Sequence, residues 1–175
     1  MARHLTTLEI QMLKPVFQNT LRYDSIVCEI NEANIGGAAN SITPAGVAHF
    51  SKFVYCPDFS KTNGAHQWVF VHEMAHVWQW GHHILPVNAA IGLFLQTAGA
   101  YTKAYPYDLT PGKRFTDFNI EQQASIVADY WALLTKKLVP QNNNNPKATL
   151  ADYTDVIKQL QTSGQSVRKL DQMPL

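Results

Sequence analysis

The sequence has few cysteines, few charged side chains and no long uninterrupted apolar run. Its 175 residues include 2 cysteines, and 15% of the residues are charged, compared with about 25% in soluble domains generally. Lysine and arginine together number 14, aspartate and glutamate 13, and the formal net charge is +1. This balance gives no electrostatic basis for binding nucleic acid or an anionic membrane, so we expect neither as a partner.

No segment is long and apolar enough to span a membrane. The longest candidate, Ile84 to Leu95, is interrupted by Pro86 and Asn88, and it is shorter than the roughly 20 apolar residues that a spanning helix needs. Residues 1–9 lack the apolar core of a signal peptide. We therefore expect the chain to be made in the cytoplasm without a signal peptide, and to depend on a carrier if it acts elsewhere.

The composition and patterning predict one α+β domain over residues 1–175. Hydrophobic residues make up 46% of the chain, which is enough for a core and excludes disorder for most of it. Apolar periodicity and capping residues predict helices at about 7–20, 65–80, 87–100, 120–138 and 148–161, and strands at about 26–30 and 47–55. The fold class is thus mostly helical, with a small β-sheet or hairpin before the helix at 65–80. Residues 162–175 are expected to form a loosely ordered tail.

The two cysteines, Cys28 and Cys56, lie in strand-like runs. The favoured interpretation is a pair of buried thiols. A disulfide between paired strands is the alternative.

The motif His72-Glu73-Met74-Ala75-His76 stands out from the rest of the sequence. Residues four apart lie on the same face of a helix, so the two imidazoles can reach a single metal ion. Zinc fits because neutral imidazole is a good ligand for it, and a site with three protein ligands keeps one position open for water. Glu73 can act on that water as general base, which makes it the candidate catalytic residue. The alternative is two surface histidines on a helix.

The third ligand decides the class of metallopeptidase. Glu121 is the stronger candidate, because it opens the helix predicted at 120–138, and some zincins take a glutamate ligand from a later helix. A glutamate that only stabilises its own helix N-terminus is the alternative. His82 is the alternative third ligand, but Gln79 stands where the metzincin pattern needs glycine. For His82, a capping or solvent-facing role at the helix end is therefore favoured.

Two further residues are candidates for supporting roles. Asp129 lies two helical turns after Glu121, and its carboxylate can orient a histidine through the free ring nitrogen. A plain aspartate at the edge of the core is the alternative. Tyr107 is the weaker choice for a catalytic residue, because a tyrosine can hold the oxyanion of a tetrahedral intermediate. The tyrosines of this loop can instead simply pack it onto the domain.

Several phrases of the sequence resemble a bacterial family of Vgr-related and Rhs-related zinc metallopeptidase domains associated with type VI secretion. Members of the family are similar to the toxin domain at the C-terminus of certain VgrG spike proteins. The resemblance extends over roughly residues 5–131 and rests on these phrases: Leu5-Thr6-Thr7-Leu8-Glu9-Ile10, Val16-Phe17, Tyr23-Asp24, Val71-His72-Glu73-Met74-Ala75-His76-Val77-Trp78-Gln79 and Phe118-Asn119-Ile120-Glu121-Gln122-Gln123-Ala124.

The resemblance implies a zincin-like fold, with zinc bound by His72, His76 and Glu121 and with Glu73 as the catalyst. It also implies an antibacterial effector that is active in the periplasm of a target bacterium, together with a separate spike carrier and a cognate immunity protein. The substrate would be a peptide or protein, such as an envelope protein or the peptide stem of peptidoglycan.

The sequence therefore predicts a single-domain, zincin-like zinc metallopeptidase that acts as a secreted toxin. Two alternatives remain open. One is a housekeeping zinc peptidase of the cytosol, and the other is a non-catalytic secretion adaptor with structural zinc. A fourth protein ligand closing the metal site would favour the adaptor.

Overall fold

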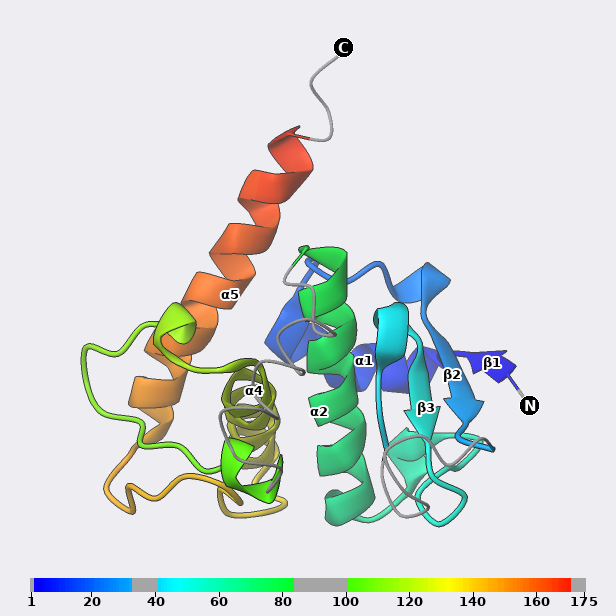
Figure 1. Ribbon diagram of the computed structural model, residues 1–175, viewed down its shortest axis with the longest axis horizontal. Coiled ribbons are helices and arrows are strands. Elements are labelled where there is room, and N and C mark those ends of the chain that lie inside the picture. Colours follow the sequence, from blue (N-terminus) through cyan, green and yellow to red (C-terminus); the bar gives the residue numbers. More distant parts are fainter. Residues whose placement is uncertain (1, 33–40, 84–100, 171–175) are drawn as a thin grey trace.

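A computed structural model of the chain describes residues 2–32, 41–83 and 101–170 (Figure 1). The helices and strands, in chain order, are β1 (Ala2–His4), α1 (Thr7–Phe17), β2 (Val27–Ile30), β3 (Ala48–Phe50), α2 (Gly64–Gly81), α4 (Ile120–Thr135) and α5 (Leu150–Leu170). The described chain is thus mostly helical with a small sheet before α2, in agreement with the sequence. The helix predicted at 87–100 lies outside the described residues.

The strands form one sheet in the order β1-β2-β3. β1 is antiparallel to β2, with Arg3 opposite Cys28, whereas β2 and β3 are parallel, with Cys28 opposite Ala48. The strands of a hairpin are antiparallel, so the prediction of a hairpin formed by β2 and β3 is wrong. Parallel strands need a long connection, and residues 31–47 provide one.

The strand predicted at 47–55 is shorter than expected. It ends at Phe50, because the chain then turns and the backbone N–H groups of Val54 and Tyr55 both donate to the carbonyl of Ser51. The run that looked like the second half of this strand is thus a turn that leads away from the sheet.

Both cysteines are free thiols. Cys28 is buried in β2, and Cys56 is half-buried beyond β3. Burial raises the pKa of Cys28 to about 12, so this thiol stays protonated at neutral pH. The structure therefore agrees with the interpretation as two thiols rather than a disulfide, although only Cys28 is fully buried.

A buried ion pair fixes the N-terminal strand to α1. Arg3 donates hydrogen bonds of 2.7 and 2.8 Å to the carboxylate of Glu9, which is fully buried. The same carboxylate accepts the backbone N–H groups of Thr6 and Phe59. The hydroxyl of Thr6 caps the helix in return. A buried carboxylate needs such partners, and these join β1 and α1 to the short helix η3 (Phe59–Lys61).

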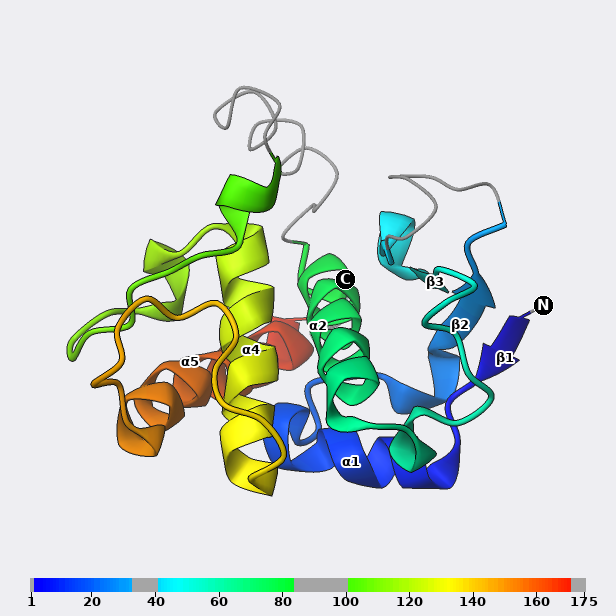
Figure 2. The same ribbon diagram turned by 90° about the horizontal axis from the view of Figure 1, so that it is seen from below.

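Helix α2 lies between the sheet and α4 (Figures 1 and 2). On the sheet side, the ring of Phe59 lies 4.6 Å from the rings of both Phe50 and Phe70, measured between centroids. On the opposite side, α2 packs along α4, while α1 crosses beneath and contacts α4 and α5. Residues 70–76 of α2 are buried all round as a result. None of the described helices is long and apolar enough to cross a membrane.

The last two helices end at other residues than predicted. α4 stops at Thr135 because Lys136 adopts a left-handed conformation, with φ of 54°. α5 continues past residue 161 to Leu170, where the sequence predicted a loosely ordered tail. This part contains no proline and a single glycine, Gly164, whose cost of about 1 kcal/mol does not end a helix that has already formed. Residues 171–175 lie outside the described residues.

Candidate metal centre

Helix α2 carries the two histidines of the motif. Its first turn is capped by Asn63, whose side chain accepts the backbone N–H of His66. No proline or further glycine interrupts the helix before Gly81. His72 and His76 are therefore one turn apart on the same face, and both are buried.

Helix α4 brings the carboxylate. Asn119 accepts the backbone N–H groups of Glu121 and Gln122 at 2.9 Å, and the side chain of Gln122 accepts the N–H of Asn119 in return. Asn119, followed three residues later by Gln122, is the capping-box pattern that marks the start of a helix in a sequence. It starts the helix one residue before Glu121, so that the Glu121 side chain leaves the first turn toward α2.

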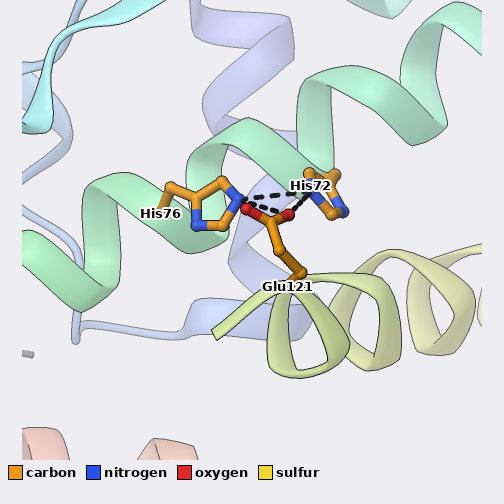
Figure 3. Close-up of side chains that lie close together, drawn as sticks. All are labelled: His72, His76 and Glu121. Atoms are coloured by element: carbon orange, nitrogen blue, oxygen red, sulfur yellow. Dashed lines mark hydrogen bonds and ion pairs between the residues drawn. The ribbon is translucent and has the colours of Figure 1, made fainter. Parts of the chain in front are cut away.

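The three predicted ligands meet between the two helices (Figure 3). Oε2 of Glu121 lies 3.2 Å from Nε2 of His72 and 3.3 Å from Nε2 of His76, and the two imidazole nitrogens are 3.2 Å apart. Among the described residues, these three form the group whose donor atoms could hold one metal ion. Two imidazoles and one carboxylate make up the donor set of a catalytic zinc site.

Gln79 determines which nitrogen of His76 faces the cluster. The amide nitrogen of Gln79 donates to the carbonyl of Ile120 and to the side-chain oxygen of Gln123, both at 3.0 Å. Its oxygen is thereby turned toward Nδ1 of His76, at 2.7 Å. In the neutral imidazole, Nδ1 then carries the proton and Nε2 has the lone pair facing the cluster, as metal binding requires. The residue at the position of the missing metzincin glycine is thus a partner of the second histidine.

Burial and the neighbouring charges shift the pKa values of His76 and Glu121 in opposite directions. Desolvation lowers the pKa of His76, but the Glu121 carboxylate outweighs it and raises the pKa to about 9. Desolvation raises the pKa of Glu121, yet the imidazoles of His76 and His72 hold it well below the usual range of a carboxyl. Glu121 is therefore ionised at neutral pH and supplies a buried negative charge suited to a cation.

Glu73 lies beside the cluster and is buried as well. Its Oε2 accepts the hydroxyl of Thr43 at 2.6 Å. Burial raises the pKa of Glu73, although His76, His72 and Thr43 offset part of this effect. A buried carboxylate with a raised pKa, next to a metal-ligating motif, is the environment of a general base.

The loop that carries Thr43 is held against α2 by a close backbone approach. Gly46, in the short helix η2 (Pro44–Gly46), has φ of +78°, and a Cβ atom there would lie 2.5 Å from Cδ1 of Trp80. Only glycine allows this approach without displacing the indole. The contact keeps Thr43 within reach of Glu73.

The structure places Tyr107 away from the three ligands. Its hydroxyl donates to Asp129 at 2.7 Å and lies 2.8 Å from the hydroxyl of Tyr153, and the side chain is 2% exposed. Tyr107 is thus part of a buried network, which does not support its choice as a catalytic residue. The ring of Tyr105 instead lies 5.8 Å from that of His72, and burial together with Glu121 and Glu73 raises its pKa. Tyr105 therefore lies beside the site.

The structure places His82 at the end of α2 rather than among the metal ligands. It also shows that Asp129 does not contact either histidine of the cluster through a hydrogen bond. His82 follows α2, where its Nδ1 lies 2.7 Å from the carbonyl of Trp78 and its ring stacks on that indole. It therefore caps the helix end, as the favoured interpretation had it. Asp129 accepts hydrogen bonds from Trp68 and Tyr107 and from two backbone N–H groups, and neither His72 nor His76 is among its hydrogen-bond partners.

Comparison with known proteins, by sequence and by structure, finds similarity to a type VI secretion spike protein and its effector domain. No family model matches the chain. In an alignment of 139 residues that covers 74% of this chain, the chain is 32% identical to the type VI secretion system spike protein VgrG2b of Pseudomonas aeruginosa, of which it spans 13%. The solved structure of the effector domain of Pseudomonas aeruginosa VgrG2b is similar, with a TM-score of 0.68 and 28% identity. That similarity covers 90% of this chain and 83% of the effector domain.

Proposed function

The chain is a relative of the effector domain of a type VI secretion spike protein, and we propose that it is a zinc-dependent peptidase delivered by that secretion system. The observation that carries the proposal is the meeting of His72, His76 and Glu121 between α2 and α4, with Glu73 alongside. The fold class we infer is zincin-like, with glutamate as the third ligand.

His72, His76 and Glu121 would hold the zinc ion. Their donor atoms lie within 4.8 Å of one another and are buried, and Gln79 turns the lone pair of His76 toward the group. A zinc ion supplies a Lewis acid that polarises a carbonyl and lowers the pKa of water.

The protein's own groups then have separate tasks in peptide hydrolysis. Glu73 accepts a proton from the attacking water and passes it to the leaving amine, for which its raised pKa is suited. Thr43 holds the Glu73 carboxylate in place through its hydroxyl. Tyr105 stays protonated because its pKa is raised, so its hydroxyl is a donor for the oxyanion of the tetrahedral intermediate.

We propose the periplasm of a target bacterium as the place of action. The substrate would be a peptide bond in an envelope protein or in the peptide stem of peptidoglycan. A spike protein would serve as the carrier, and an immunity protein would protect the producing cell. The relationship to a spike-borne effector domain supports delivery of this kind.

Replacement of Glu73 tests the proposal. Glu73→Gln keeps the acceptor for Thr43 and leaves all three ligands intact, so the variant should fold and bind about one zinc ion per molecule. Loss of the general base should lower hydrolysis by about 10²- to 10⁴-fold. The toxicity of the periplasmically exported protein should disappear with it. Glu29→Gln, at a half-buried carboxylate of β2 that lies 3.5 Å from His49, serves as the matched control and should behave as wild type.

Two outcomes would contradict the proposal. If Glu73→Gln keeps its metal and its full toxicity, the harm does not come from hydrolysis, and a non-catalytic adaptor becomes the better explanation. If the wild type is as toxic in the cytoplasm as in the periplasm, or harmless in both, a periplasmic effector is excluded. Zinc content would be measured by metal analysis and toxicity by growth after targeted expression.

A further inference from the structure

The two histidines of the cluster are held in different ways. Nδ1 of His76 has a hydrogen-bond partner in Gln79, at 2.7 Å. Nδ1 of His72 is buried and has no hydrogen-bond partner among the described residues. Metal-ligating histidines ordinarily donate this second nitrogen to a carboxylate, a carbonyl or water, which fixes the ring. Among the described residues, the contacts that orient His72 are therefore of another kind.

The indole of Trp68 covers one face of the His72 ring. Trp68 precedes His72 by one turn of α2, so that the two side chains lie on the same face of the helix. Their ring centroids are 5.3 Å apart, and the planes are inclined by 24°. The ring of Tyr105, 5.8 Å away, also lies near His72. Rotation of the imidazole about its Cβ–Cγ bond would break the stacking.

Asp129 in turn fixes the indole. Its Oδ1 accepts the Nε1–H of Trp68 at 2.7 Å and the backbone N–H of Gln141 at 2.8 Å. Its Oδ2 accepts the hydroxyl of Tyr107 at 2.7 Å and the backbone N–H of Asn142 at 3.3 Å. The carboxylate is fully buried and has four donors, so it cannot shift without losing bonds from several segments. Trp68 is consequently anchored to α4 and to the loop after it.

We propose that Trp68, anchored by Asp129, positions His72 for metal binding, in place of the direct hydrogen bond that His76 donates to Gln79. This inference rests on the proposed function, because it takes His72 as a zinc ligand. Trp68 and Asp129 are positioning residues and touch neither metal nor substrate. The carboxylate thus acts on the histidine through an intervening ring.

The stacked indole has a second effect on binding. An imidazole that coordinates a cation gains positive charge, and the face of an indole carries negative potential. A hydrogen bond from Nε1 to a carboxylate increases the electron density of the ring. The stack should therefore favour the metal-bound form of His72 over the free form, beyond its effect on geometry.

Zinc titration of a tryptophan variant tests the inference. Trp68→Phe removes the N–H and much of the ring area, and it should lower zinc affinity by about 10- to 100-fold, as loss of the groups that orient ligands does. Trp78→Phe is the matched control. Trp78 lies on the same helix and also donates its N–H, to Thr20 at 3.0 Å, but it stacks on His82 rather than on a ligand. Its zinc affinity should stay close to that of the wild type.

A second pair of variants tests the anchor. Asp129→Asn should weaken zinc binding and alter the visible absorption spectrum of the cobalt-substituted protein, because the geometry of the His72 ligand changes. Tyr153→Phe removes a hydroxyl that contacts Tyr107 rather than Asp129 itself. It should leave the zinc affinity and the cobalt spectrum unchanged. The folding of each variant would be checked by circular dichroism before titration.

The outcomes separate this inference from the proposed function. If the wild type binds no zinc, both are overturned. If the wild type binds zinc and folded Trp68→Phe binds it equally tightly with an unchanged cobalt spectrum, only the positioning role is overturned. If Trp68→Phe and Asp129→Asn both fail to fold, the two residues serve the fold, and the positioning role is again rejected.

Discussion

The hydroxyl of Thr43 donates to Oε2 of Glu73 across 2.6 Å, and this bond joins the loop before β3 to the carboxylate next to the first ligand. Both side chains are buried, so water does not readily replace the bond. The position of the carboxylate is thereby determined by a residue that is distant in the sequence.

Removal of this hydroxyl should affect catalysis more than substrate binding. Thr43→Val keeps the shape of the side chain and leaves Glu73 without its donor, so we expect kcat to fall by about 10-fold, equivalent to roughly 1.4 kcal/mol, with little change in KM. Thr43→Ser keeps the hydroxyl and should restore most of kcat. Steady-state kinetics on a peptide substrate, with zinc content measured in parallel, would show the difference. Equal activity of the two variants would assign Thr43 to packing alone.

Zinc titration can show directly whether Glu121 or His82 is the third ligand. Glu121→Ala removes one of the three converging donors and should weaken zinc binding strongly. His82→Ala should leave zinc affinity unchanged, because His82 caps the end of α2 and stacks on Trp78. Its effect should be a modest loss of stability. A zinc titration that gives the reverse ranking would show that the site is not of the two-histidine, one-glutamate type.

Substitution of Tyr105 should affect mainly activity, and substitution of Tyr107 should affect mainly stability. Tyr105→Phe removes the hydroxyl of the ring that lies 5.8 Å from His72, and it should lower kcat per folded molecule. Tyr107→Phe leaves the buried Asp129 with one donor fewer, which should destabilise the protein by about 1–3 kcal/mol. Its activity per folded molecule should stay close to wild type. Urea denaturation and steady-state kinetics on both variants would decide the assignment.

The metal-free protein should be most stable in mildly acidic solution. The lowered pKa of Glu121 stabilises the fold above the unfolded value of about 4.3, and this stability is lost as the pH falls toward the lower folded value. The raised pKa of His76 stabilises the fold below the unfolded value of about 6.5. That contribution is lost as the pH rises to the folded value of about 9.

Denaturation of the metal-free protein at several pH values would test this dependence. Its free energy of unfolding should decline between about pH 6.5 and 9. Zinc affinity should rise over the same range, because the imidazole must lose its proton to bind a metal. His76→Ala should remove most of the decline, whereas a wild-type curve that is flat over this range would argue against the His76–Glu121 ion pair.

The sequence predicted the elements that local signals define. Asn119 and Gln122 marked the start of α4, and this start places Glu121 in the first turn. The spacing of His72 and His76 on a continuous helix required both imidazoles to share a face. These relationships depend on residues within a few positions of one another, so the shared face of the two histidines and the place of Glu121 at the start of α4 were accessible without the tertiary structure. The packing of α4 against α2, which brings Glu121 to the histidines, was not.

Other features depend on contacts between distant segments. β1 has only three residues, too few for any alternation of apolar and polar side chains, and its pairing with β2 could not be predicted. The burial of Tyr107 away from the three candidate ligands could not be predicted for a similar reason. Tyr107 forms a bridge with Asn143, and its backbone bonds to Asn142 and Asn144 turn the side chain into the core. The polar composition of that later loop does not reveal this pairing. Gln79, three residues after His76, is the partner that helical spacing could have indicated.

The buried ion pair of Arg3 and Glu9 selects one alignment of the sheet. Side chains alternate between the two faces of a strand, so a slip of β1 by one residue along β2 would turn Arg3 to the opposite face. Glu9 would then be left with a buried charge and no cation, which is strongly unfavourable. A three-residue strand has little intrinsic preference for one register over the next. The ion pair of Arg3 and Glu9 therefore determines the register in which β1 pairs with β2 when the sheet forms.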